Sequence, residues 1–415
     1  LNFVLVIGAI TALFMGFLGI IQNDIKRVVA YSTLSQLGYM TVALGASAYS
    51  VAIFHLMTHA FFKALLFLAA GSVIIGMHHE QDMRKMGGLR KYMPITFWTS
   101  VLGTLALVGT PFFSGFYSKD TIIEATKFNA IESPTWVANY AYLAVLLGAF
   151  VTSFYSFRLL YMTYFGEERF RHAHDSHGHD SHDHDSHDHD SGDAAHEDAH
   201  GHDEHAHHGV HEPHESPWVV TLPLILLAIP SVLIGYFTAG PMLFATDWAG
   251  HHDQLPYFLG AIDVNAASDV LAKIKTELWH GPLKFALHGF TAPAFLLAFS
   301  GFALATVMYW WKPHLPAKIA QFPLIAVARR ILENKYGMDD LWIGGFAGGG
   351  LLAGKFSRKH DEKVIDGFFV NGSARFVELF SSLLRRTQSG YLYHYAFAMI
   401  LGLIALLAVL IKFWR

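Results

Sequence analysis

Three titratable side chains, His55, His59 and Lys63, stand four residues apart inside the apolar stretch Ala52–Gly76. This spacing places them on one face of a helix, over two turns. A lysine inside a membrane span costs about 2.5–3.5 kcal/mol on insertion scales, so it normally faces a bundle interior or a hydrated cavity. Neutral histidine can pass a proton between its ring nitrogens near neutral pH. The pattern favours a proton relay; the alternative is a pair of satisfied core histidines beside a lysine that reaches the interface.

A second candidate site follows an interruption of an apolar run. Gly109, Pro111 and Gly115 come just before the adjacent charges Lys119 and Asp120. Proline removes a backbone donor and clashes with the preceding turn. Broken helices at membrane depth are tolerated where they line a cavity or a site. We therefore predict a broken helix that presents Lys119 and Asp120 to the interior, with a simple proline kink near the interface as the alternative.

Long apolar runs must position these residues. Of the 415 residues, 53% are hydrophobic and 15% are charged. About 20 apolar residues suffice for a helix to cross the hydrocarbon core. We therefore predict an all-α polytopic membrane protein. The expected spans are about 2–21, 25–46, 50–77, 95–130 (interrupted), 137–162, 217–238, 290–311 and 391–413.

Composition excludes several kinds of chemistry. The chain has no cysteine, so it offers no disulfide, no iron–sulfur ligation and no thiolate nucleophile. Neither a dinucleotide-binding glycine motif nor a P-loop is present. Any redox centre that serves this chain is therefore expected in another subunit.

Basic residues predict the orientation. They gather in the loops after the first and third spans, whereas the loop after the second span has none. The positive-inside rule then places four segments in the cytoplasm, namely 22–27, 78–94, 163–216 and 312–390, and segment 239–289 outside. Lys26, beside Asp24 and Arg27, is either an ordinary cytoplasmic anchor or a proton entrance. Tyr31, Ser32, Ser35 and Tyr39 follow it and either hydrogen-bond water or hold helices together.

A His/Asp tract spans His172–His214 and includes a five-residue repeat from Asp175 onward. It has almost no apolar residue, so we expect a disordered cytoplasmic loop. Clustered imidazoles bind Zn, Ni or Cu, and the choice lies between a metal buffer and an insertion that binds metal only adventitiously. We predict no metal site elsewhere in the chain.

The segment 312–390 is amphipathic rather than membrane-spanning. Apolar residues recur at helical spacing in Phe376, Leu379, Phe380, Leu383 and Leu384, with charged residues on the other face. This pattern indicates a helix that lies along a surface. The glycine run Gly344–Gly354 is a poor helix former, which weakens the case for one unbroken helix over 321–386.

Four stretches carry a resemblance to a known family: "DIKRVVAYSTLSQLGYM", "AIFHLMTHAFFKALLFLAAGSVI", "HHEQDMRKMGGLRKYMP" and "FFSGFYSKDTIIEA". They resemble the L subunits of bacterial NADH:quinone oxidoreductase (respiratory complex I), the largest antiporter-like proteins of its membrane arm. The resemblance is specific from Asp24 to about Phe165 and looser afterwards. It implies two inverted five-helix repeats, each with a broken helix, followed by C-terminal additions that include a lateral helix. This chain would be an N-terminally truncated fragment that carries the second repeat and those additions.

The resemblance also implies roles for individual residues. In the family, the His/His/Lys helix is part of a central hydrophilic axis, and the lysine of the broken helix ends the proton-conducting half toward the outer side. These roles fall on His55, His59, Lys63 and Lys119, with Asp120 as an electrostatic support. The chain would then be one subunit of a proton-translocating oxidoreductase in the bacterial inner membrane.

Expected partners and cofactors follow from the same resemblance. The partners would be other membrane-arm subunits, contacted through the bundle and the lateral helix, and membrane lipids, with no nucleic acid. The chain would hold no cofactor, since FMN, iron–sulfur clusters and quinone belong to other subunits. The expected division is 1–162 antiporter-like repeat, 163–216 His/Asp-rich loop, 217–311 two further spans, 312–390 lateral segment and 391–415 terminal anchor.

Three rival interpretations stay open. An Mrp-type Na⁺/H⁺ antiporter subunit shares the same core. A zinc transporter would use the helical metal-ligand spacing of His55 and His59, although a cationic Lys63 one turn away would repel Zn²⁺. A purely structural scaffold is the third, since half of a conduit need not conduct alone.

Overall fold

The computed structural model describes residues 1–171, 212–249, 257–258, 261–262 and 269–414. The His/Asp tract therefore lies outside the described residues, apart from its last three positions, 212–214. The chain divides into two compact units, Leu1–Lys335 and Tyr336–Arg415. The described residues are helices and connecting turns, with one isolated bridge between Asp24 and Asp82, so the all-α prediction is confirmed.

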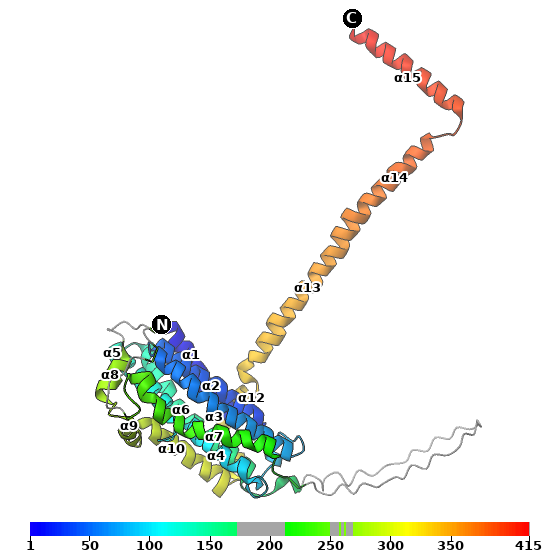
Figure 1. Cartoon of the computed structure of the whole chain (residues 1–415). Coiled ribbons are helices and arrows are strands. Elements are labelled where there is room, and N and C mark those ends of the chain that lie inside the picture. Colours follow the sequence, from blue (N-terminus) through cyan, green and yellow to red (C-terminus); the bar gives the residue numbers. More distant parts are fainter. Residues whose placement is uncertain (172–211, 250–256, 259–260, 263–268, 415) are drawn as a thin grey trace, which may run out of the picture. The chain divides into compact units, whose positions relative to one another are not determined.

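The first unit is a bundle of long helices (Figure 1). The inner helices α3 and α6 contact the most neighbours, because α3 lies against α2, α4, α5 and α7, and α6 lies against α1, α4, α5 and α10. Its helices are α1 (Asn2–Ile21), α2 (Ile25–Gly45), α3 (Tyr49–Gly76), α4 (Pro94–Val108), α5 (Ser114–Glu132), α6 (Trp136–Tyr164), α7 (Trp218–Ala239), α8 (Val270–Glu277), α9 (Pro282–Gly289), α10 (Pro293–Thr306), α11 (Leu315–Ile319) and α12 (Pro323–Glu333).

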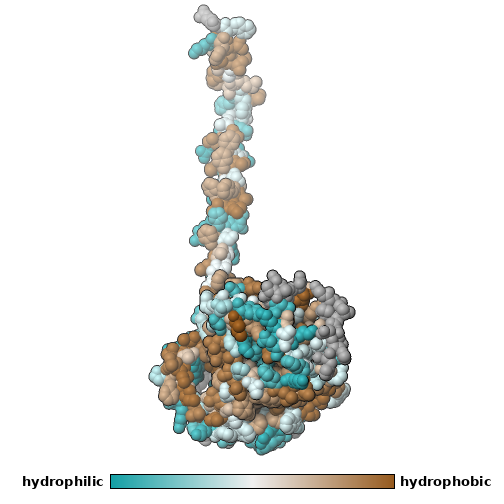
Figure 2. Space-filling model, turned by 90° about the vertical axis from the view of Figure 1, so that its left-hand side faces the viewer, coloured by the Kyte–Doolittle hydropathy of each residue, from teal (hydrophilic) through white to brown (hydrophobic). Residues whose placement is uncertain are grey.

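Six described helices are long and apolar enough to cross a membrane. They begin at Asn2, Tyr49, Trp136, Trp218, Pro293 and Leu392. Two of the eight predicted spans differ. The helix α2 has the length of a span, but its polar residues make it less apolar than the others, and the predicted span 95–130 is two helices, α4 and α5. Figure 2 shows hydrophobic residues over much of the bundle surface, as a lipid-facing protein requires.

The predicted helix break lies between α4 and α5. Gly109 ends α4 with φ +84°, and Phe112 has φ +75°, so the chain leaves the helix here in a conformation that glycine adopts readily. Gly115, in the first turn of α5, packs directly on α4. A Cβ there would lie 1.9 Å from the carbonyl oxygen of Ala106, which no side chain can do. The break and this close approach together fix where α5 presents its polar residues.

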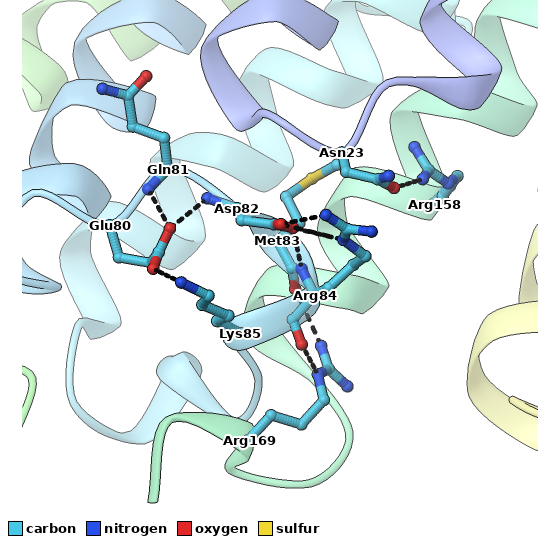
Figure 3. Close-up of polar contacts among 9 residues, drawn as sticks. All are labelled: Asn23, Glu80, Gln81, Asp82, Met83, Arg84, Lys85, Arg158 and Arg169. Carbon is cyan, nitrogen blue, oxygen red and sulfur yellow. Dashed lines mark hydrogen bonds and ion pairs between the residues drawn. The ribbon is translucent and has the colours of Figure 1, made fainter. Parts of the chain in front are cut away.

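Three loops meet at one end of the bundle, which we call the basic end: 22–27, 78–94 and 163–171. Main-chain hydrogen bonds join the first two, from Ile25 to the Gln81 carbonyl (3.0 Å) and from Met83 to the Asn23 carbonyl (2.8 Å). Arg169 then reaches the carbonyls of Met83 and Arg84 from the third loop (Figure 3). The sequence placed all three loops on the same side, and these contacts agree with that.

Arg158 holds the turn between α1 and α2 from its position on α6. Its side chain is 4% exposed. The guanidinium donates to the carbonyl oxygen of Gln22 and, at 2.7 Å, to Oδ1 of Asn23 (Figure 3). Arginine stays charged in proteins, so this buried cation is stabilised by the two oxygens and by the ring of Tyr309, whose centroid lies 5.6 Å from Cζ.

We expect Arg158→Met to lower the free energy of unfolding by about 2 kcal/mol, because it removes two charge-assisted hydrogen bonds to partly buried oxygens. Arg171→Met is the matched control. Arg171 is about half exposed and pairs with Glu168 at 2.6 Å, so its loss should cost at most about 1 kcal/mol. Thermal denaturation of the purified full-length protein compares the two variants. Equal shifts in Tm would show that Arg158 does not hold the turn.

The second unit begins with a long helical segment. Helical turns continue from Asp340 through α13 (Gly348–His360) to the end of α14 (Asn371–Thr387), and α15 (Leu392–Phe413) follows. The glycine run does not interrupt this segment. The actual break lies earlier, at Lys335, Tyr336 and Gly337, which have positive φ. The range 321–386 is therefore not one unbroken helix, but the interruption lies at 335–337 and not in the glycine run. The amphipathic pattern over 376–384 lies on α14 as predicted.

Candidate functional site

The three predicted residues of α3 lie inside the bundle. His55 is fully buried, His59 is 6% exposed and Lys63 is 4% exposed. All three face the interior, so Lys63 does not reach the surface of the protein. The ring centroids of His55 and His59 are 5.9 Å apart, as expected for neighbours one turn apart on the same face.

His55 connects three helices. Its Nδ1 lies 2.8 Å from Oγ of Ser118 on α5, and its Nε2 lies 3.2 Å from Oε1 of Gln36 on α2. Ser118 also lies 2.8 Å from the hydroxyl of Thr58 on α3. Both ring nitrogens of His55 therefore have a partner, and the ring can pass a proton from one partner to the other.

His59 and Lys63 differ in their contacts. Nε2 of His59 has no hydrogen-bond partner among the described residues. Nζ of Lys63 donates to Oγ of Ser32 on α2, and Ser32 donates to the carbonyl of Val29. A buried amine with a single hydroxyl partner is poorly stabilised as a cation. Lys63 is thus placed where a small change in its surroundings alters its charge.

Lys119 lies on α5, one turn after the helix break, and is 2% exposed. Its Nζ has no hydrogen-bond partner among the described residues. It lies 4.9 Å from the ring centroid of Tyr39, whose hydroxyl donates to the carbonyl of Val145 at 2.6 Å. The ring face can stabilise the charged amine without a carboxylate. Lys119 is close enough to His55 and Lys63 to interact with both electrostatically.

An acidic pair accompanies Lys119 on α5. Asp120 is 6% exposed and Glu124 is 5% exposed, one turn further along. Glu124 accepts from Lys127 at 2.9 Å, and Asp120 is close to both. Asp120 was predicted from the sequence and Glu124 was not, although the i, i+4 spacing of the two carboxylates is visible there. Asp120 and Glu124 interact with each other and with Lys127.

All five predicted site residues are buried inside the first unit. Gln36, Thr58 and Ser118, which connect His55 to its neighbours, were not predicted from the sequence. Ser32 was noted only as a polar residue of the second span. Among the described residues, no group of three or more His, Cys, Asp or Glu side chains could hold a metal ion. The amines, imidazoles and hydroxyls of these residues can hold protons and exchange them with one another.

Comparison with known proteins shows the family of the chain. Residues 1–151 match the family model described as NADH:quinone oxidoreductase/Mrp antiporter, transmembrane. Over its whole length the chain is 51% identical to subunit L of NADH-quinone oxidoreductase from Neisseria meningitidis, covering 56% of that protein. The chain belongs to this family of antiporter-like membrane subunits.

More distant family members also match nearly the whole chain. Subunit L of Rhodobacter capsulatus is 38% identical over 97% of this chain and 58% of that protein. Chain 5 of the NADH-ubiquinone oxidoreductase of Marchantia polymorpha is 33% identical over 98% of this chain and 54% of its own length. A solved Mrp complex from a Dietzia species gives a TM-score of 0.42 at 18% identity, over 69% of this chain and 48% of that one. The chain thus spans little more than half the length of the curated relatives.

Proposed function

We propose that the full-length protein is a membrane-arm subunit of NADH:quinone oxidoreductase that moves protons across the bilayer. The observation that carries this proposal is the row His55, His59 and Lys63, buried on one face of α3 and joined by hydroxyls to α2 and α5. Soluble or structural roles do not require three titratable groups at membrane depth. The chain itself supplies no redox centre, and we assign FMN, iron–sulfur clusters and quinone to other subunits.

In this proposal a proton passes along the buried row and leaves at the helix break. Lys63 and the two histidines exchange protons, His55 and Ser118 connect α3 to α5, and Lys119 releases the proton toward the outer side. Asp120 stabilises the charged form of Lys119. Moving one charge against roughly 180 mV costs about 4 kcal/mol. Two charges about 4 Å apart at an effective dielectric constant near 20 interact by about as much. A change of one neighbouring charge can therefore drive each release.

Location and partners follow the same proposal. The basic end, with the loops 22–27, 78–94 and 163–216, faces the cytoplasm by the positive-inside rule, together with 312–390. The segment 239–289 faces outward. Other membrane-arm subunits contact the bundle and the amphipathic helix of the second unit, and α15 anchors the C-terminal end in the inner membrane. The division into segments at residues 162, 216, 311 and 390 is part of this proposal.

An Mrp-type Na⁺/H⁺ antiporter subunit is the second candidate, because the matched family model covers both kinds of protein. Inverted membrane vesicles from cells with and without the full-length protein separate the two. We expect the vesicles that contain the protein to acidify on addition of NADH, with quinone present and without Na⁺, and those that lack it to acidify far less. Na⁺-driven proton exchange without NADH, together with unchanged NADH-driven acidification, would favour the antiporter and contradict the proposal.

A further inference from the structure

We propose that a hydrated polar track along α6 gives Lys63 its own proton access from the basic end of the bundle. This inference rests on the proposed function, since it concerns where the protons of the buried row come from. The track runs from a surface cavity beside the α1–α2 turn, past Arg158 and Tyr155, to Ser32 and Lys63. The track is separate from the contacts of His55 and from the helix break. In the proposed function, those two features carry the proton from α3 to α5.

The first observation is a run of buried hydroxyls on α6, at Thr152, Tyr155, Ser156 and Thr163, whose side chains are at most 4% exposed. The hydroxyls of Ser156 and Thr163 have no hydrogen-bond partner among the described residues, and that of Tyr155 lies next to Thr152. They fall on one face of α6, at i, i+3, i+4 and i+11. Buried hydroxyls elsewhere return to their own helix, as Thr121, Thr126 and Ser100 do to the carbonyl four residues back. The face of α6 is therefore polar and available to water.

The second observation connects this face to Lys63. The hydroxyl of Tyr155 lies beside the side chains of Thr152 and Ser32. Ser32 accepts the hydrogen bond of the Lys63 amine. The ring of Tyr155 lies against α1, where a Cβ on Gly19 would be 3.2 Å from it, so its position is fixed by packing. Only the two hydroxyls of Tyr155 and Ser32 therefore separate the amine of Lys63 from the polar face of α6.

The third observation connects the other end to the surface. A cavity of about 560 Å³ at the basic end is lined by the α1–α2 turn and the loop after α3. Gln22 and Asn23 belong to its wall, and their oxygens hold the buried guanidinium of Arg158. Arg158 follows Tyr155 by three residues, nearly one helical turn, and its Nε has no hydrogen-bond partner among the described residues. Arg158 therefore links the wall of the cavity to the buried hydroxyls of α6.

The cavity wall is polar and charged, as a water-filled entrance requires. It carries the carboxylates of Asp24, Glu80, Asp82 and Glu333 together with the basic side chains of Arg27, His79, Arg84 and Lys335. The hydrogen bonds of Arg84 hold the pKa of Asp82 below its usual range, so Asp82 stays ionised close to Arg158 (Figure 3). Carboxylates at a water-filled mouth attract protons from solution.

The proposed step is a proton transfer alone. Neutral Lys63 takes a proton from the water beside Ser32 and Tyr155. That water is re-protonated through the hydroxyls of the α6 face, and the proton is finally replaced from solution at the cavity. No bond other than O–H and N–H forms or breaks.

The 415 residues contain no cysteine, so a single introduced thiol can be followed among them in the assembled complex. Thr152→Cys places a thiol on the track, and Leu160→Cys places one in an apolar part of the same helix, nearer the basic end and 3% exposed. Ag⁺ is added to vesicles with either the cytoplasmic or the outer face exposed. After quenching and denaturation, the thiols still free on the peptide of this subunit are alkylated and measured by mass spectrometry.

With Ag⁺ added to the cytoplasmic face, we expect the thiol of Thr152→Cys to be blocked at least about tenfold faster than that of Leu160→Cys. We also expect the thiol of Thr152→Cys to react faster with Ag⁺ added to the cytoplasmic face than with Ag⁺ added to the outer face. Equal rates for the two cysteines, or faster reaction from the outer face, would overturn the proposal. As a second measurement, the Tyr155→Phe/Thr152→Val variant should slow NADH-driven pumping several-fold, whereas Ser231→Ala, a buried hydroxyl on α7 bonded to its own helix, should not. The thiol measurement does not depend on pumping, so the track can fail while the proposed function stands, and the reverse.

Discussion

Replacing Lys63 with alanine in the full-length subunit should lower NADH-driven proton pumping at least about tenfold while the complex still assembles. A positioned proton-transfer group typically contributes a factor of about 10²–10⁴ to the rate of its step. Lys63 is the only lysine of α3, and its amine donates to Ser32, so no other amine on this helix can take its place. Because pumping and quinone reduction are coupled, quinone reduction should slow as well, whereas NADH oxidation with an artificial acceptor at the peripheral arm should not change.

Lys91→Ala is the matched control for this variant. Lys91 is exposed at the basic end and lies 3.4 Å from Glu168, so its removal deletes a charge without touching the interior. Both variants are reconstituted in the intact complex, and the initial rate of acidification is measured with a pH-sensitive dye. Pumping by Lys63→Ala at the rate of the Lys91 variant would mean that the buried row is structural.

Lys119→Ala should change the yield of pumping rather than its speed. In the proposal Lys119 is the last group before the outer side, so its loss should leave electron transfer running with fewer protons delivered per electron. Its Nζ has no hydrogen-bond partner among the described residues, so alanine leaves no hydrogen-bonding group unpaired there. Only the contact with the Tyr39 ring is lost, which is worth about 0.5–2 kcal/mol. The protein should therefore fold.

Lys127→Ala is the control on the same helix. Lys127 pairs with Glu124 at 2.9 Å and is 38% exposed at its side chain, so its loss removes a charge two turns from Lys119 but not from the interior row. The proton-to-electron ratio is measured in liposomes with a pulse of NADH. A ratio equal to that of wild type for Lys119→Ala would remove Lys119 from the route.

Local spacing explains what could be predicted from the sequence. His55, His59 and Lys63 are four residues apart, so any helix puts them on one face, and the cost of burying them suggested an interior site. The helix break was visible because Gly109 and Pro111 disfavour a continuous helix whatever surrounds them. The positive-inside count grouped the loops 22–27 and 78–94 on one side, and they are joined there by hydrogen bonds.

Contacts between distant segments could not be predicted in this way. Ser118, Gln36 and Ser32 meet the α3 row only because α5 and α2 pack against it, and nothing in their local sequence states this. The buried hydroxyls of α6 are invisible for the same reason, since Ser and Thr in helices usually return to their own carbonyls. The glycine run Gly344–Gly354 suggested an interruption that the structure does not have. The free-energy cost of one glycine in a helix is small, and the helix continues through the run.

The most direct test of the central claim is a comparison of Lys63→Ala, Lys119→Ala and the double variant in one reconstituted complex. The measured quantity is the number of protons pumped per electron. Two residues that serve one route are not additive, because breaking the route once already stops it. The account predicts that the double variant pumps no worse than the worse single variant. Losses that multiply, with the double variant well below both single variants, would contradict a single relay from Lys63 to Lys119.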